Sequence, residues 1–279
     1  MKRACLFLLA SVAFGQGQQP NVSNAKFEMR AFFGDLSAQI RSDAPTWFGY
    51  AIKTARSHEG SCCWNSGREC GCALEGSEAR TTVRGTTGNV PVPLEGLDAM
   101  AVLFRVANNT IEKVQAYSLS CQLDAGGLPF IWISGVTAQA SLAFLDKLID
   151  ADGSHRVTDG ALFALSQHEG AEAIDRLIRR AKRDASPHLR GQALFWLAQR
   201  AGDRAAATIT DAIVNDPDTG VKKRAVFALS QLPDGEGVPK LIDVARTQRN
   251  PEVRKQAFFW LGQSKDPRAF AFIESVLTK

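Results

Sequence analysis

The sequence lacks the common signals for catalysis and for a membrane span. After the N-terminal segment, no stretch approaches 18 consecutive apolar residues, so we expect no transmembrane helix. The motifs Gly-x-Ser-x-Gly and His-Glu-x-x-His are missing, as is a phosphate-binding glycine loop. Glycine makes up only 23 of 279 residues, which excludes a collagen-like chain. These absences give no support to the enzyme classes that such motifs mark.

The net charge is also small. The formal charge is +4, and removal of Lys2 and Arg3 with a leader would leave +2. A field this weak does not predict nucleic-acid binding. With 45% hydrophobic and 22% charged residues, the composition excludes general disorder and fits one or two globular domains.

The first fifteen residues, MKRACLFLLASVAFG, have the pattern of a cleavable signal peptide. Lys2 and Arg3 form a positive start, residues 6–12 are apolar, and Ala13 and Gly15 are small residues before a cleavage point. The alternative is a buried N-terminal helix. We expect export, and therefore a periplasmic or secreted protein.

Five cysteines remain after the leader, four of them within the run SCCWNSGRECGC. Such clustering in an oxidising compartment favours disulfides over free thiols. The alternatives are a metal site that includes His58, or reduced thiols with redox activity. We predict disulfides, with one cysteine left over, among Cys62, Cys63, Cys70, Cys72 and Cys121.

An internal repeat dominates the C-terminal half. Four segments align without gaps at a period of 32 residues, namely ALFALSQ from Ala161, ALFWLAQ from Ala193, AVFALSQ from Ala225 and AFFWLGQ from Ala257. Within each unit, apolar spacings of three and four residues predict two helices, separated by short breaks rich in Gly, Asp and Pro. Residues 141–149 fit the same spacing before the first full unit, so we interpret them as a half-repeat. Such pairs must stack to bury their apolar faces, which predicts a solenoid.

The run from Leu189 and Arg190 through Ala193 to Leu197 resembles the short HEAT-like repeats, the kind found in phycobilisome lyases. A basic residue recurs at the second position as Arg190, Lys222 and Arg254, and Thr158 departs from it. The resemblance covers about residues 138–279 and implies an α-helical HEAT-like solenoid.

The N-terminal half has a different pattern. Residues 47–52, 100–106, 111–119 and 129–134 are rich in apolar, β-branched and aromatic residues and predict strands, the middle two joined as a hairpin. Residues 33–41 predict a helix. Residues 129–135 also fit the repeat phase, so a degenerate first helix is the alternative there.

These patterns predict a small α+β domain before the HEAT-like solenoid. The expected organisation is a signal peptide over 1–15, a cysteine-containing α+β domain over 16–136, and four repeats with a leading helix over 137–279. The N-terminal domain resembles no family that we recognise.

HEAT-repeat proteins include enzymes whose metal ligands lie at the turns between helices. Deoxyhypusine hydroxylase holds iron with several His-Glu pairs at its inter-helix turns, and this chain has His168-Glu169 at such a turn. The corresponding pairs in the other repeats contain neither histidine nor carboxylate. We therefore expect no hydroxylase site, and we interpret His168 as a solvated turn residue. An exported chain is also poorly placed for intracellular bilin attachment.

Two basic clusters lie on the expected helices. They comprise Arg179, Arg180, Lys182 and Arg183 in the first repeat, and residues 222–224 in the third. Solvated helix faces are the simpler interpretation, with contact to an acidic partner as the alternative.

A column of aromatic residues is the best candidate for a binding surface. At about 100° per residue, the phenylalanines of the first helices point away from the core-facing alanines and leucines, with an amide one turn further on. Exposed aromatic stripes usually mark interaction sites, whereas burial against neighbouring helices is the alternative. The partner-binding candidates are Phe163, Phe195, Phe227, Phe259, Gln167, Gln199, Gln231 and Gln263.

The sequence therefore predicts an exported, non-enzymatic protein-interaction module without cofactor or metal. We expect an unidentified protein partner, no nucleic acid and no membrane insertion. The alternatives are an enzyme, or a redox or metal-binding protein, with its site among the N-terminal cysteines.

Overall fold

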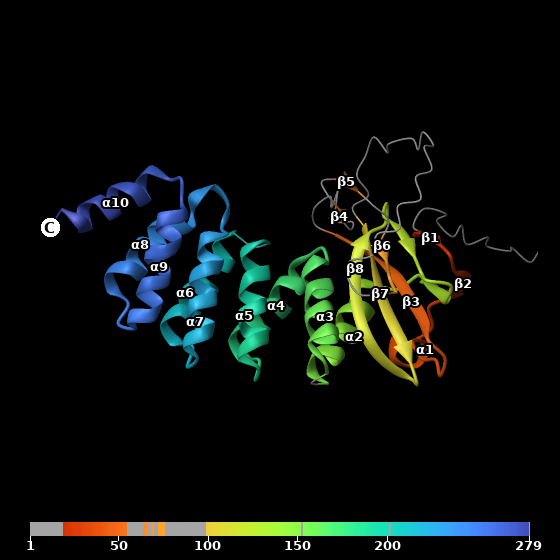
Figure 1. Cartoon of the computed structure of the whole chain (residues 1–279). Coiled ribbons are helices and arrows are strands. Elements are labelled where there is room, and N and C mark those ends of the chain that lie inside the picture. The colour runs from red at the N-terminus through yellow and green to blue at the C-terminus, as the bar shows by residue number, and fades with distance from the viewer. Residues whose placement is uncertain are drawn as a thin grey trace, which may run out of the picture.

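The computed structural model places strands in the N-terminal part of the chain and a row of helices in the C-terminal part (Figure 1). It describes residues 19–54, 64–65, 68–69, 72–75, 99–151, 153–200 and 202–278. The predicted signal peptide and three of the candidate cysteines, Cys62, Cys63 and Cys70, lie outside the described residues, as does His58. Among the described residues, no helix is long and apolar enough to cross a bilayer.

A mixed five-stranded sheet forms the centre of the N-terminal part. Its order is β2-β10-β3-β7-β8, in which β2, β10 and β3 run parallel and β3, β7 and β8 run antiparallel. The four strand predictions are confirmed, and the helical alternative for residues 129–135 is wrong. The strands are β2 (Lys26–Ala31), β3 (Thr46–Lys53), β7 (Ala99–Ala107), β8 (Thr110–Ser118) and β10 (Pro129–Ser134).

The hairpin between β7 and β8 turns on two asparagines. Asn108 and Asn109 have φ angles of 50° and 57°, the left-handed conformation that a two-residue type I′ turn requires. Asparagine tolerates this conformation better than other non-glycine residues. The local sequence therefore sets the register of the two longest strands.

Smaller elements surround this sheet. The strands β1 (Asn21–Ser23), β9 (Gln122–Asp124) and β6 (Cys72–Ala73) form a parallel sheet, and β4 (Trp64–Asn65) pairs with β5 (Arg68–Glu69). The helix predicted over 33–41 is short, α1 (Leu36–Gln39). We did not predict β1 and β2 from the sequence. The alternation of polar and apolar residues over 26–31 was an available signal for β2, which is an edge strand exposed along its whole length.

The central sheet has a hydrophobic core on each face. Alternate residues of β3 and β7, such as Phe48, Tyr50 and Phe104, pack with the helices. Their neighbours, including Trp47 and Leu103, pack with β6 and β9 in a second core. The strands are buried on both sides, which explains their continuous apolar character.

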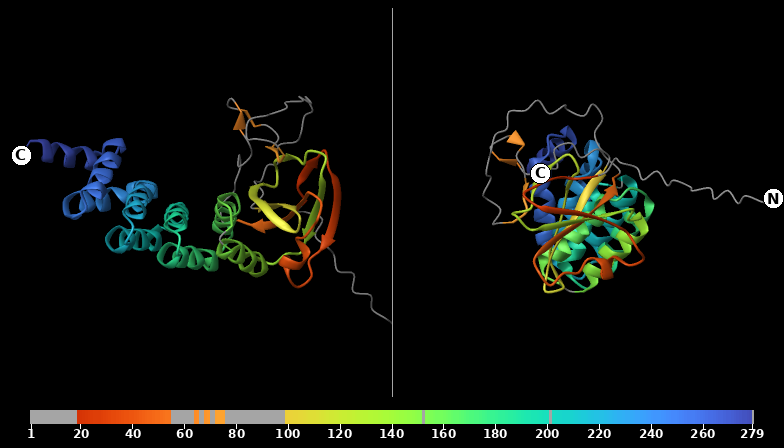
Figure 2. Two further views of the ribbon diagram at one scale, coloured as in Figure 1. Left: turned by 60° about the horizontal axis from the view of Figure 1, so that its bottom comes forward. Right: turned by 90° about the vertical axis from the view of Figure 1, so that its right-hand side faces the viewer.

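The C-terminal part is an array of helical pairs, as predicted. Successive first helices α3, α5 and α7 stand side by side in Figure 1, and Figure 2 shows the whole array from two further directions. The helices are α2 (Ala138–Asp150), α3 (His155–Gln167), α4 (Ala171–Arg183), α5 (Pro187–Ala198), α6 (Gly202–Asn215), α7 (Thr219–Ser230), the 3-10 helix η1 (Pro233–Gly235), α8 (Gly237–Thr247), α9 (Pro251–Gln263) and α10 (Pro267–Leu277).

The first helices begin at matching polar residues. The side chains of Ser186, Asp218 and Asn250 accept hydrogen bonds from backbone N–H groups at the starts of α5, α7 and α9. Arg190, in the basic position of the repeat, forms a buried ion pair with Asp216, at 2.7 Å between Nε and Oδ2. The caps recur because the sequence repeats, whereas the equivalents of Arg190 bond to backbone carbonyl oxygens instead, Lys222 to Val214 and Arg254 to Gln248.

The array and the sheet share one hydrophobic core. Helix α3 lies directly on β8, where a Cβ added to Gly160 would stand 2.1 Å from the Val114 carbonyl oxygen. Only glycine permits this approach. Because residues from both parts pack together here, the domain boundary after residue 136 stays a prediction.

Candidate functional site

The four predicted phenylalanines lie on the first helices and keep part of their surface in solvent. Phe163, Phe195 and Phe227 are half-buried, and Phe259 is 52% exposed. The alanines two positions earlier in each helix are completely buried in the core. We call this row of aromatic side chains, together with Trp196 and Trp260, the aromatic ridge.

The two tryptophans make the ridge continuous. Ring centroids lie 4.8 Å apart for Phe163 and Trp196, and 4.8 Å apart for Phe227 and Trp260. Between these pairs, Phe195 stacks on Phe227 at 5.8 Å. Within α5 and α9, each tryptophan also contacts the phenylalanine before it in the chain. The ridge therefore runs without a break across all four repeats.

The two tryptophans were not predicted as part of this surface, because they occur only in alternate repeats. The corresponding positions of the first and third repeats are Ala164 and Ala228, both fully buried. A small residue at these two positions leaves space beside the phenylalanine, and the tryptophan of the following repeat packs there. The signal that could have identified them is their spacing of 64 residues, twice the repeat length.

The glutamines one turn further on are not equally accessible. Gln167 is only 5% exposed and donates to Ser166, so it does not reach solvent as an edge to the ridge. Gln199 and Gln231 are half-buried, and Gln263 is exposed. An amide edge is therefore available from the second repeat onward.

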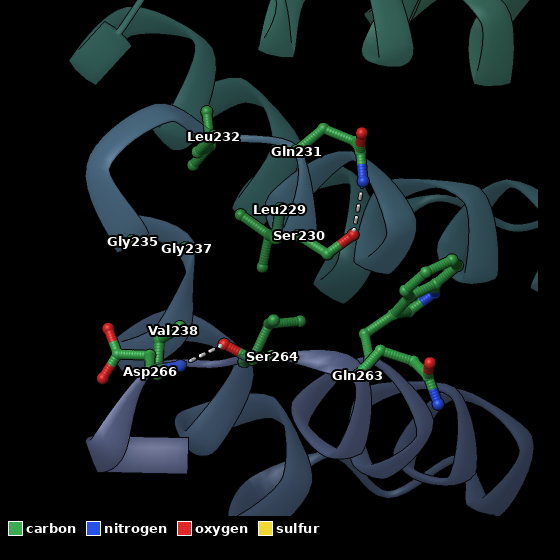
Figure 3. Close-up of a pocket in the computed structure, with 12 residues that line it drawn as sticks. Leu229, Ser230, Gln231, Leu232, Gly235, Gly237, Val238, Gln263, Ser264 and Asp266 are labelled. Carbon is green, nitrogen blue, oxygen red and sulfur yellow. Dashed lines mark hydrogen bonds between the residues drawn. The ribbon is translucent and has the colours of Figure 1, made fainter.

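A pocket of about 450 Å³ adjoins the C-terminal end of the ridge (Figure 3). It lies where α7 and α9 end and α8 begins, and Trp260, Gln231 and Gln263 contribute to its wall. The indole Nε1 of Trp260 is buried and has no hydrogen-bond partner among the described residues.

Basic side chains border the ridge on its other side. Lys223 and Lys255 stand one helical turn before Phe227 and Phe259, and Arg224 is exposed beside them. The first-repeat cluster differs, because Arg180 is largely buried in ion pairs with Asp146, Asp150 and Asp184. The interpretation of that cluster as a solvated face is therefore wrong for Arg180.

His168 is not the solvated turn residue that we expected. It is buried, its Nδ1 lies 2.9 Å from the Ala164 carbonyl oxygen, and its Nε2 lies 2.9 Å from the Ser141 hydroxyl. That hydroxyl also contacts the Tyr50 hydroxyl of β3, at 2.8 Å. Burial lowers the pKa of His168 to about 4, so the ring is neutral near pH 7 and joins the helices to the sheet.

Comparison with known proteins agrees with the repeat architecture. A family model of HEAT repeats matches residues 174–257 and 206–279. Among solved structures, the complex of CpcE and CpcF of phycocyanin lyase from Nostoc sp. PCC7120 is similar, with 20% identity, 50% of this chain and 91% of that chain covered, and a TM-score of 0.38. No curated protein matches the chain. The family match therefore supports the interpretation of residues 174–279 as HEAT repeats.

Proposed function

We propose that this protein is an exported scaffold that binds a partner protein along the aromatic ridge. The observation that carries the proposal is the unbroken row of half-exposed rings from Phe163 to Phe259. Exposed contiguous apolar surface usually marks an interaction site. Tryptophan is also among the residues most often found at the energetic centre of protein interfaces.

The charges beside the ridge indicate the chemistry of the partner. Lys223, Arg224 and Lys255 would lie next to a segment that covers the rings of the third and fourth repeats. Complementary charge speeds association and selects against partners of like charge. The partner that fits best is a protein segment that combines apolar side chains with acidic residues.

The pocket beside Trp260 offers an anchor for such a segment. Its wall combines the apolar Leu229, Val238 and Leu241 with amide and hydroxyl groups. An apolar side chain of the partner would enter this space, while the side-chain amides of Gln231 and Gln263 would bind its backbone. The third and fourth repeats are therefore the expected centre of binding.

Selection from a random peptide library displayed on phage tests the proposal directly. We expect the mature protein to enrich peptides that carry both acidic and apolar residues. Phe259→Ser should weaken binding of these peptides by about ten-fold or more, the usual range for an interface anchor. Phe270→Ser is the matched control, because Phe270 is 72% exposed on α10 and lies outside the ridge.

A reversal of charge beside the aromatic ridge provides the second arm of this test. Lys255→Glu should weaken the same peptides and reduce the dependence of their affinity on salt. Enrichment of basic peptides, or equal loss from the changes at Phe259 and Phe270, would contradict the proposed surface.

Export and disulfide formation form part of the same proposal. The leader-like pattern of residues 1–15 supports export. Cys72 and Cys121 are both buried in the same hydrophobic core, which supports the proposal of a disulfide and of an oxidising compartment.

Intact mass spectrometry of protein from its native host would check export and bridging together. We expect a chain that begins near Gln16. Its mass should increase on reduction, and the size of the increase gives the number of disulfide bonds. Retention of Met1 would contradict export, and a mass unchanged by reductant would contradict bridging.

A further inference from the structure

Two histidines and an aspartate meet at the start of the helical array. His155 and Asp159 lie on α3, and His188 lies on α5. Their nearest ligand atoms all lie within 4.8 Å of one another. His188 Nε2 is 2.8 Å from Asp159 Oδ1, and the two imidazole rings are 4.5 Å apart.

The repeat itself creates this cluster. His155 and Asp159 are four residues apart, so they share one face of α3. His188 is one repeat plus one residue after His155. It therefore lies on the adjoining first helix, at a similar position along the helix axis. The cluster therefore joins the first repeat to the second.

The geometry points to a binding site for a divalent transition-metal ion, and we propose that His155, Asp159 and His188 coordinate one of the zinc type. Two imidazoles and one carboxylate suit Zn²⁺, which often takes three protein ligands and completes its shell with water. His155 is exposed and the other two are partly exposed, so water can reach the metal. Modest side-chain rotation would bring the three ligand atoms to coordination distance.

Neighbouring groups partly oppose a cation here. The N-termini of α3 and α5 carry partial positive charge, and Arg156 and Arg224 lie nearby, with Arg224 donating to the His188 carbonyl oxygen. The carboxylate of Asp159 compensates for part of this charge. We therefore expect a reversible site that tightens the first two repeats when it is occupied, because a ligand that binds only the folded state stabilises it.

Calorimetric titration of the oxidised full chain with Zn²⁺ tests this site. We expect one ion to bind per chain, and the thermal midpoint to rise with it. His188→Ala and Asp159→Asn should each weaken binding by about ten-fold or more. Asp211→Asn, which removes an exposed carboxylate of α6, should leave Zn²⁺ affinity unchanged.

Substitution with Co²⁺ distinguishes this site from one built on cysteines. Nitrogen and oxygen ligands give a visible spectrum without a thiolate charge-transfer band, and that spectrum should disappear in His188→Ala. A charge-transfer band, binding that survives both ligand substitutions, or no binding by the wild-type chain would each overturn the proposal.

Discussion

Replacement of Leu197 by alanine should lower the free energy of unfolding by about 2–5 kcal/mol, the range for a buried leucine. Leu197 is completely buried in α5, and its equivalents Leu165, Leu229 and Leu261 are buried in the same way. All four belong to the core that continues from the repeats into the sheet. A cavity at this point would therefore weaken the contacts of α5 with both neighbouring first helices.

Leu277→Ala provides a matched control for this change. Leu277 is 79% exposed at the end of α10, so the same chemical deletion should cost less than about 0.5 kcal/mol. Chemical denaturation followed by circular dichroism and by tryptophan fluorescence would measure both variants. A cost below about 1 kcal/mol for Leu197→Ala would show that the core face has been assigned wrongly.

Acidification should destabilise the junction between sheet and helices through His168. Its pKa in the folded chain is about 4, below the value near 6.5 expected when unfolded. The unfolded chain therefore takes up a proton first as the pH falls. Stability from this group is complete above about pH 6.5 and is lost progressively down to pH 4, by about 3 kcal/mol in total.

The surroundings of His168 support this direction. The ring contacts the Ala164 carbonyl group and the Ser141 hydroxyl, which is itself bonded to Tyr50, while Arg200 and Arg176 further disfavour its protonation. Its backbone also pairs with Thr54 at the end of β3. A positive charge at this point would be poorly solvated and would weaken the junction.

Comparison with His168→Gln isolates this contribution, because glutamine cannot take up a proton in this range. Urea denaturation between pH 7 and pH 4 should show a smaller loss of stability in the variant than in the wild-type chain. Parallel losses in the two proteins would show that His168 does not titrate as described.

Periodicity accounts for most of what the sequence predicted correctly. The 32-residue repeat identified the helical pairs and the buried alanine and leucine positions, because every repeat must bury the same face. Asparagines at 108 and 109 identified the hairpin through local turn chemistry. These features depend on near neighbours along the chain or on strict repetition.

Features that depend on contacts between different parts of the chain were missed. His168 belongs to a turn by sequence, yet it is buried because β3 and α2 close over it. The edge strand β2 pairs with β10, about a hundred residues later, and is exposed along its whole length. The cluster of His155, Asp159 and His188 becomes visible only when one repeat is placed on the next.

Site-specific photo-crosslinking in the native host tests the central claim, that the aromatic ridge is the docking surface. The crosslinker p-benzoylphenylalanine would replace either Phe259, on the ridge, or Phe270, on α10 outside it. We predict adducts from position 259 whose crosslinked partner peptide is acidic and apolar, and none from position 270. Adducts of equal yield at both positions, or adducts at position 270 alone, would contradict the assignment of the ridge.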